Sequence, residues 1–572
     1  MNVSAASWTS NARNLAELHR LQAERYGPRP ALRYKRHGLY HDLSWQEYRE
    51  QVLACGAALV EGGIRPGDRV GLLSENCVEW LVADLAIMAA GAVNVPPHAP
   101  LSARQVHFQL HDASARWLFV STQAQLEKVQ PILAELPVLQ GIVVFEKRGR
   151  ESFSVRAEKT PDPFFWESFL QQGRRALPRL QAELSQRETA LGPDDLATIM
   201  YTSGTTGNPK GVMLTHSNLL SNVAAVLASD PPGADDLPLS WLPFSHIYAR
   251  TMDHYRSVAS AAPMALAESQ ETLVQNLEEI QPTHMNSVPR FYEKVLTAVS
   301  SPDPAETARR LRKVYGRRIE FLCSGGAPLP LPVAEAYQAA GLLLLQGYGL
   351  TESSPVISFN RKTRHRLNTV GLPLPSVEVR IAPDGEILSR GPHIMKGYWN
   401  NPQATAEAIR DGWLHTGDLG SLDADGFLSI TGRKKELMVL SNGKKLVPSQ
   451  IEGLLLGEPC IDQAVVNGEG RNFLTALIVP QWDNLREALQ REGTTVDGKV
   501  ETLCGNQVVC KFLQQRIDAT LADVSAWEKV KKFIVLPRPF SVAAEELTVS
   551  LKLRRNVVLS KYRAELDALY CD

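Results

Sequence analysis

The chain has 572 residues, of which 44% are hydrophobic and 22% are charged, so it can form several domains that each bury a core. This composition excludes collagen-like, intrinsically disordered and disulfide-rich proteins. The 61 basic and 62 acidic residues give a net charge of −1, which excludes an overall positive field for binding nucleic acid or an anionic membrane.

The cysteines and the apolar windows predict a cytoplasmic protein. The 7 cysteines are scattered and contain no CxxC pair, as expected in a reducing compartment. Residues 1–20 are largely polar where a signal peptide has an apolar stretch. The most apolar window, residues 80–97, contains Asp84, Asn94 and two prolines, and is too interrupted for a transmembrane helix. We therefore expect no transmembrane segment, whereas peripheral contact with a membrane stays open.

The N-terminal part of the chain alternates between helical and extended patterns. Residues 44–63 and 77–91 have apolar residues at the spacing of amphipathic helices. Residues 67–74, 93–97 and 116–121 have the composition of short strands. Strands that alternate with helices in this way predict parallel βα units.

The middle of the chain interrupts this alternation and then resumes it. Residues 147–193 are polar, contain prolines and have weak periodicity, so we expect an excursion before a strand at 197–203. Further predicted βα elements cover residues 318–330, 332–341 and 342–352.

The pattern changes again near residue 369. Short alternating strands separated by glycine and proline turns predict a small antiparallel sheet or barrel, and a separate α+β unit follows from residue 449. We therefore predict an α/β fold. A large N-terminal domain, residues 1–431, would contain doubly wound βα subdomains and a small β-barrel, and a smaller α+β domain would cover residues 436–572.

The most informative pattern is YTSGTTGNPKGVMLTHSN, residues 201–218. A predicted strand leads into a loop of glycines and hydroxyl residues that ends at Lys210. Glycines let backbone N–H groups approach a phosphate, and serine and threonine hydroxyls add donors. The Walker A pattern does not fit this loop, in which Pro209 would be out of place. The alternative is an ordinary turn between two elements.

The stretch TSGTTGNPKG resembles the phosphate-binding signature of the AMP-forming acyl-adenylate synthetases, a superfamily that includes acyl-CoA synthetases. Nearly the whole chain shares this resemblance. Further blocks follow in the family's order: LPFSHIYAR (242–250), SGGAPLP (324–330), QGYGLTE (346–352), GWLHTGDLG (412–420) and GRKKELMVLSNGKKLVPSQIE (432–452). The resemblance implies that ATP, Mg²⁺ and CoA take part in the reaction.

The resemblance also implies a set of nucleotide-binding residues. Tyr348 is expected to stack on adenine, Asp418 to accept both ribose hydroxyls, and Arg433 to reach ribose or phosphate. Thr202 and Glu352 carry oxygen ligands suited to Mg²⁺. Taken alone, Glu352 is more typical of a solvated loop carboxylate, and an aspartate in a TGD turn, such as Asp418, is usually an Asx-turn residue. The full set expected to bind ATP or AMP is Thr202, Ser203, Gly204, Thr205, Thr206, Gly207, Lys210, Gly326, Ala327, Gln346, Gly347, Tyr348, Gly349, Thr351, Glu352, Asp418 and Arg433.

Two lysines are expected to screen the approach of a carboxylate to ATP. Lys210 comes from the phosphate loop. The second is expected from the C-terminal domain, where LTVSLKLRR (547–555) resembles the ending of the long-chain branch and points to Lys552. Val549 replaces a usual proline there, and a basic surface helix is the alternative. The predicted catalytic residues are Lys552, Lys210, Glu352 and Thr202.

The resemblance implies two half-reactions in one site. Acyl-AMP and pyrophosphate form first, and a thiolate then attacks the acyl carbon. Between the two steps the small domain is expected to rotate about a hinge at residues 432–435, with Lys435 as the hinge residue. Gly443 and Lys444 are expected to line the pantetheine tunnel of CoA, and a simple β-turn is the alternative for Gly443.

The combined blocks look like the long-chain fatty acyl-CoA synthetase branch. A long-chain acid needs an apolar channel, and Trp241 and His246 are candidates for its wall. A packed core histidine is the alternative for His246. Arg250, in the same block, is expected to hold structure rather than touch the substrate.

We therefore predict a ligase that activates a fatty acid as acyl-AMP and transfers the acyl group to CoA. Asn368 and Ser376 stand where glycine is usual in this family and leave the acceptor open. An acyl carrier protein presents the same pantetheine thiol and is the alternative acceptor. A catalytically silent module that binds nucleotide or lipid is the non-enzymatic alternative.

Overall fold

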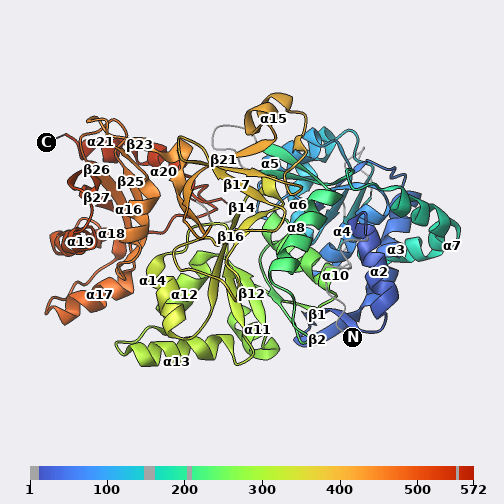
Figure 1. The fold of residues 1–572 in the computed structure, drawn as a ribbon, viewed down its shortest axis with the longest axis horizontal. Coiled ribbons are helices and arrows are strands. Elements are labelled where there is room, and N and C mark those ends of the chain that lie inside the picture. Colours follow the sequence, from blue (N-terminus) through green and yellow to red (C-terminus); the bar gives the residue numbers. More distant parts are fainter. Residues whose placement is uncertain (1–11, 147–161, 203–208, 549–552, 572) are drawn as a thin grey trace. The chain divides into compact units, whose positions relative to one another are not determined.

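The computed structural model describes residues 12–146, 162–202, 209–548 and 553–571 (Figure 1). The chain divides into a large and a small compact unit. The large unit comprises Met1–Ala327, Glu335–Arg380 and Leu388–His415, and the small unit comprises Pro328–Ala334, Ile381–Ile387 and Thr416–Asp572. The domain boundary predicted at residues 431–436 stays a prediction.

An eight-stranded sheet runs through the large unit. In spatial order, its strands are β19 (Gly397–Tyr398), β9 (Lys210–Thr215), β8 (Leu196–Thr202), β4 (Val93–Val95), β3 (Arg69–Leu73), β5 (Ala115–Val120), β6 (Gly141–Val144) and β7 (Phe164–Phe165). Strand β9 is antiparallel to both of its neighbours. The other adjacent pairs are parallel, so the predicted βα units are confirmed.

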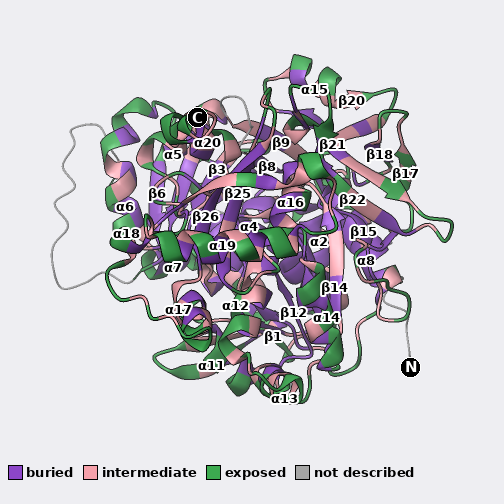
Figure 2. Ribbon diagram, turned by 90° about the vertical axis from the view of Figure 1, so that its left-hand side faces the viewer, coloured by how far each residue is buried: buried purple, intermediate pink, exposed green. Residues whose placement is uncertain are grey.

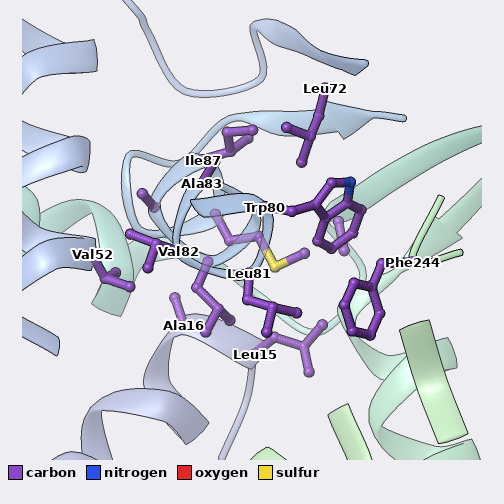
Figure 3. Packing of buried hydrophobic residues seen from close by; sticks show 14 of the residues in the cluster. Leu15, Ala16, Val52, Leu72, Trp80, Leu81, Val82, Ala83, Ile87 and Phe244 are labelled. Atoms are coloured by element: carbon purple, nitrogen blue, oxygen red, sulfur yellow. The ribbon is translucent and has the colours of Figure 1, made fainter. Parts of the chain in front are cut away.

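Two predicted helices are confirmed beside this sheet, as α3 (Trp45–Glu61) and α4 (Val78–Ala89). Ser44 and Glu47 form a capping box that satisfies the N-terminus of α3. Helix α4 is buried on every side except at Glu79. Figure 3 shows how side chains of α4 pack with residues from α2 (Leu15–Tyr26), α3, β3 and a neighbouring segment: Leu15, Ala16, Val52, Leu72, Trp80, Leu81 and Phe244.

Helix α7 (Trp166–Ala190) lies where the sequence patterns predicted an irregular excursion. Its buried residues recur at helical spacing along one face: Trp166, Phe169, Leu170, Gly173, Ala176, Leu184 and Glu188. Helix α7 packs on α3 so closely that a side chain at Gly173 would collide with the backbone of Ala54. The prediction for residues 166–190 is therefore wrong, because Pro178 and a long polar face masked the periodicity. Residues 147–161 of the same stretch lie outside the described residues.

Two further sheets lie in the large unit. One has the order β12 (His284–Ser287), β13 (Phe321–Ser324), β14 (Leu344–Gly349), β15 (Val356–Phe359), β16 (Leu372–Pro373). Strands β12, β13 and β14 pair in parallel, whereas β15 is antiparallel to both of its neighbours, β14 and β16. The other sheet has the order β10 (Leu239–Ser240), β11 (Met264–Leu266), β1 (Pro30–Arg36), β2 (Leu39–Ser44).

Helices connect these strands in the chain, as the βα pattern predicted. They are α8 (His216–Ser229), α11 (Leu273–Ile280), α12 (Pro289–Val299), α13 (Pro304–Tyr315) and α14 (Leu331–Ala339). Figure 2 shows buried residues along β3, β8 and α4, whereas α13 presents a mostly exposed surface. The predicted elements at 318–330, 332–341 and 342–352 are confirmed as β13, α14 and β14.

The small unit has a core of its own. Its three-stranded sheet has the order β25 (Ile461–Asn467), β26 (Leu474–Pro480), β27 (Val530–Val535), and every residue of the central strand β26 is buried. Its helices include α16 (Pro448–Leu455), α17 (Trp482–Arg491), α19 (Gln507–Thr520), α20 (Arg555–Lys561) and α21 (Arg563–Ala568). This mixture confirms the predicted α/β architecture with a smaller α+β part at the C-terminus. Within the described residues, no helix combines the length and the apolar character that a membrane crossing requires.

Candidate functional site

The hairpin of β8 and β9 carries the predicted phosphate loop. Thr202 ends β8, Lys210 begins β9, and the two residues are register partners across the hairpin. The ladder therefore holds both ends of the loop next to each other. The predicted loop residues Ser203, Gly204, Thr205, Thr206 and Gly207 lie outside the described residues.

Lys210 and Glu352 contact the same tyrosine. The Nζ atom of Lys210 lies 4.9 Å from the ring centroid of Tyr398, a distance at which the ring quadrupole attracts a cation. The Tyr398 hydroxyl donates a hydrogen bond to Oε1 of Glu352 at 2.8 Å. The structure thus brings together two of the predicted catalytic residues through a third residue that the motifs did not single out.

Glu352 is placed by a sharp change of direction at the end of β14. Thr351 and Glu352 begin a 3₁₀ helix, η3 (Thr351–Ser353). The backbone N–H of Leu350, the residue before this helix, donates to Ser353 Oγ at 2.9 Å. A side chain at Gly349 would collide with the backbone carbonyl of Pro355. Glycine is therefore required for this close approach, which turns the chain and presents Glu352.

The SGGAPLP block begins at the last residue of β13, and the QGYGLTE block begins within the neighbouring parallel strand β14 and runs past its carboxyl end. Ser324 and Gln346 are register partners in β13 and β14. After β13, Gly326 has a φ of +82°, and both Gly326 and Ala327 are exposed. Ligands of open α/β sheets bind beyond the carboxyl ends of the strands, so both blocks are suitably placed for a nucleotide. The stacking of adenine on Tyr348, which is largely buried, stays a prediction.

Glu352 suits an ion that is held mainly by nucleotide phosphates, and the role of Thr202 as a second ligand stays a prediction. No group of three or more His, Cys, Asp or Glu side chains suited to a metal ion occurs among the described residues. Mg²⁺ typically keeps several waters and is bound through one or two carboxylates together with substrate phosphates. Tyr398 engages Oε1 of Glu352, and within the described part of the chain Oε2 has no hydrogen-bond partner. One oriented carboxylate of this kind suits such an ion.

In the small unit, Asp418 and Arg433 form an ion pair. They are register partners in β21 (Trp413–Leu422) and β22 (Leu428–Arg433), and Nε of Arg433 lies 2.9 Å from Oδ1 of Asp418. Asp418 is buried, whereas the side chain of Arg433 is half-exposed. A carboxylate held in this way can accept hydrogen bonds from hydroxyl groups, and a guanidinium can bind phosphate. Their roles toward ribose stay predictions.

The predicted hinge and CoA-tunnel residues lie on an exposed part of the small unit. Lys435 is exposed, and Gly443 occupies a turn in which its N–H donates to the carbonyl of Leu440 at 2.9 Å. The φ of Gly443 is +77°, so the turn itself favours glycine there. Lys444 Nζ lies 4.7 Å from the ring centroid of Trp527. The hinge and tunnel roles stay predictions, and Lys552 lies outside the described residues.

Trp241 and His246 lie just ahead of a short helix in the large unit. The Trp241 ring packs on Phe291 with centroids 5.4 Å apart. The His246 ring accepts the backbone N–H of Tyr248 at 3.2 Å and stacks on His98 at a centroid distance of 6.2 Å. Burial lowers the pKa of His98 to about 4, so His98 is neutral near pH 7. Both predicted pocket residues are held by ring contacts, and their role toward an acyl chain stays a prediction.

Two family models match the chain. A model described as AMP-binding enzyme matches residues 20–399, and one described as AMP-binding enzyme C-terminal domain matches residues 435–572. The chain is 33% identical to a long-chain-fatty-acid–CoA ligase, FadD15, from Mycobacterium bovis, with 93% of each chain covered. It is 27% identical to a long-chain-fatty-acid–[acyl-carrier-protein] ligase, AEE15, from Arabidopsis thaliana, with 99% of this chain and 88% of that protein covered.

Solved structures share the fold. The anthranilate CoA ligase AuaEII, in complex with anthranoyl-AMP, superposes with a TM-score of 0.77 at 20% identity, covering 97% of this chain and 98% of that one. At this identity the likeness concerns the fold alone.

Proposed function

This chain belongs to the AMP-binding enzyme family, as its motifs predicted, and we propose that it is a long-chain fatty acid–CoA ligase. The observation that carries the proposal is the 33% identity, over 93% of both chains, to a ligase of that name. The contacts among Lys210, Tyr398 and Glu352 support it, because they join residues of two blocks that the family resemblance assigns to ATP.

The first proposed half-reaction forms acyl-AMP. A carboxylate oxygen of the fatty acid attacks the α-phosphorus of ATP, and the bond between that phosphorus and the pyrophosphate oxygen breaks. Both reactants are anionic, so cations near the phosphates lower the barrier. In the proposal Lys210 binds these phosphates, Asp418 and Arg433 hold the ribose, and Tyr348 stacks on the adenine. Bound Mg²⁺ would neutralise phosphate charge, with Glu352 and Thr202 as its ligands.

The second proposed half-reaction transfers the acyl group. A thiolate attacks the acyl carbon, the bond from that carbon to the phosphate oxygen breaks, and AMP leaves. No covalent enzyme intermediate is required. The proposal places Lys435 at the hinge between the two states, Gly443 and Lys444 beside the pantetheine arm, and Trp241 and His246 along the acyl chain.

A panel of carboxylic acids, scored by pyrophosphate release with ATP, tests the enzymatic proposal. We expect release with palmitate and weaker release with acetate or benzoate. Release with no acid of any length would favour the non-enzymatic alternative, a module that only binds nucleotide or lipid. Release confined to short or aromatic acids would contradict the long-chain assignment.

Thioester formation measured separately with CoA and with acyl carrier protein tests the acceptor. The likeness to a ligase that is named for an acyl carrier protein makes this second acceptor a specific alternative. Transfer to CoA is the expected result, and transfer to the carrier protein alone would contradict it. We also propose a cytoplasmic enzyme that reaches its lipid substrate by peripheral contact with membranes, which vesicle co-sedimentation would test.

Lys552 is proposed to act in the first half-reaction only. We expect Lys552→Ala to slow adenylation by about 10²–10³-fold, because it removes a charge aimed at the transition state, and to keep thioester formation from supplied acyl-AMP. Lys511→Ala, which changes an exposed lysine of the same unit, is the matched control. Unchanged rates in both half-reactions would show that another cation fills this role.

A further inference from the structure

Tyr398 joins two residues that lie far from it in the chain. Its hydroxyl donates to Oε1 of Glu352, from the turn after β14, and its ring lies against the ammonium group of Lys210, at the start of β9. Tyr398 itself comes from β19, a two-residue edge strand. The hydroxyl and the aromatic face of this one side chain therefore each engage a different charged group.

The backbone around Tyr398 is tied down on both sides. Tyr398 pairs with Val212 in the sheet register, and its N–H donates to Thr405 Oγ1 at 2.9 Å. The next residue, Trp399, donates its N–H to the carbonyl of Gly211 at 2.7 Å and its Nε1–H to the carbonyl of Asp112 at 3.0 Å. The backbone from which the Tyr398 ring projects is therefore fixed by the sheet and its neighbours, independently of the contact with Glu352.

The Tyr398 hydroxyl acts as a donor. A phenol with the ordinary tyrosine pKa of about 10 is protonated near pH 7. A protonated phenol has one hydrogen to donate, and Glu352 Oε1 accepts it at 2.8 Å. The hydrogen bond restricts rotation of the carboxylate about its last side-chain bond, because one oxygen is fixed in place.

We propose that Tyr398 is a positioning residue that orients the carboxylate of Glu352 toward the metal ion bound with ATP. This inference rests on the proposed function, in which Glu352 is a ligand of Mg²⁺. A freely rotating carboxylate loses conformational entropy when it binds an ion. Because Tyr398 already restricts the rotation of Glu352, this entropy cost of ion binding is smaller. The ring also lies beside Lys210, so one side chain aligns the metal ligand and packs against the phosphate-binding cation.

Tyr398→Phe tests this inference, because it removes the hydroxyl and keeps the ring against Lys210. The measurement is the dissociation constant of ATP by calorimetry, once with excess Mg²⁺ and once with EDTA. We expect binding with Mg²⁺ to weaken about tenfold, in line with the loss of a hydrogen bond to a charged group, and binding without metal to stay unchanged. Tyr201→Phe is the matched control, since Tyr201, on β8, also donates to a carboxylate, Asp112 Oδ2, at 2.5 Å.

A Glu352→Gln background sharpens the test. There, Tyr398→Phe should cause no further loss of Mg²⁺-dependent binding, because the two changes act through one contact. Equal binding of wild type and Tyr398→Phe in Mg²⁺ would overturn the inference, and so would equal weakening with and without the metal. Failure of the wild type to bind ATP in either condition would instead contradict the proposed function.

A spectroscopic measurement avoids the risk that the variant does not fold. 3-Fluorotyrosine at position 398 keeps the hydroxyl and reports its surroundings through the ¹⁹F chemical shift. We expect the signal to move when Mg²⁺ is added to the ATP complex, and a label at Tyr201 to stay in place. A signal at position 398 that does not respond to Mg²⁺ would overturn the inference.

Discussion

Two arginine–aspartate pairs in this chain have the same chemistry and differ in how far the arginine is exposed. In the large unit, the side chains of Arg250 and Asp84 are both 0% exposed. In the small unit, the side chain of Arg433 is 45% exposed and that of Asp418 is 5% exposed. The Arg250–Asp84 pair is therefore suited to stabilise the fold, whereas the exposed guanidinium of Arg433 is accessible to a ligand.

Arg250 directs its donors to buried protein groups. Its Nε donates to the Tyr255 hydroxyl at 2.7 Å, its Nη1 donates to Thr198 Oγ1 at 2.8 Å, and its Nη2 donates to Asp84. Burial alone raises the pKa of Asp84, but Arg250 and His254 outweigh this effect and lower it to about 2. Because Thr198 lies in β8, this network braces the strand that leads to the predicted phosphate loop.

Breaking the buried pair should have the largest effect. We expect Arg250→Met to lower the free energy of unfolding by about 3–5 kcal/mol, because Asp84 would remain buried without its cation. Chemical denaturation measures the change. The matched control is Arg390→Met, which breaks an exposed pair with Glu378 in the same unit and should leave the midpoint nearly unchanged. Equal losses in both variants would contradict a special role for the buried pair.

Asp253, a buried aspartate that forms no such ion pair with the residues that the structure describes, sharpens the comparison. Burial raises the pKa of Asp253 to about 6, although Ser240 and Asn286 donate hydrogen bonds to it at 2.6 and 2.5 Å. The folded state therefore holds a proton that the unfolded state releases near pH 4, and the stability from this group is lost as the pH rises through 6.

Asp253→Asn has no such proton to lose. As the pH rises from 4 to 7, we expect the wild type to lose roughly 2–3 kcal/mol of unfolding free energy that the variant does not lose. The difference in stability between the variant and the wild type should therefore shift by that amount in favour of the variant. Denaturation curves of both proteins at several pH values measure this difference. Parallel stability profiles across that range would show that Asp253 has no raised pKa in the folded protein.

Breaking the half-exposed pair should affect ligand binding rather than the fold. We expect Asp418→Asn to weaken ATP binding about 10–100-fold, because a neutral amide replaces an acceptor proposed to bind ribose. Calorimetry measures the binding, and denaturation of the same variant checks its stability. A large loss of stability with unchanged ATP affinity would place Asp418 with Asp84 among the structural residues.

Much of the candidate site was predictable because its residues stand in short contiguous blocks. Thr202 and Lys210 flank one glycine-rich loop, and the structure holds them as register partners. Glu352 follows a strand directly, and Gly349 before it is required by a close approach of the backbone. Each block is short and contiguous, so its resemblance to the family's motif can be recognised in the sequence alone, and that resemblance supplies the expected chemistry.

Tyr398 could not be predicted in the same way. Its partner Glu352 is 46 residues away, and β19 is too short to show a periodicity. The only local signal is an aromatic pair after Gly397, which is equally typical of a core. Helix α7 was missed for a related reason, because Pro178 and a long polar face hide a stripe that becomes clear only when α7 packs on α3.

The central claim is that acyl-AMP links the two half-reactions. Palmitate labelled with ¹⁸O in its carboxylate, incubated with the enzyme, ATP and CoA, tests it most directly by mass spectrometry of the nucleotide product. Attack of the carboxylate on the α-phosphorus, followed by cleavage at the acyl carbon, predicts AMP that carries one ¹⁸O atom per palmitoyl-CoA formed. Unlabelled AMP, or ADP with labelled phosphate, would contradict the account.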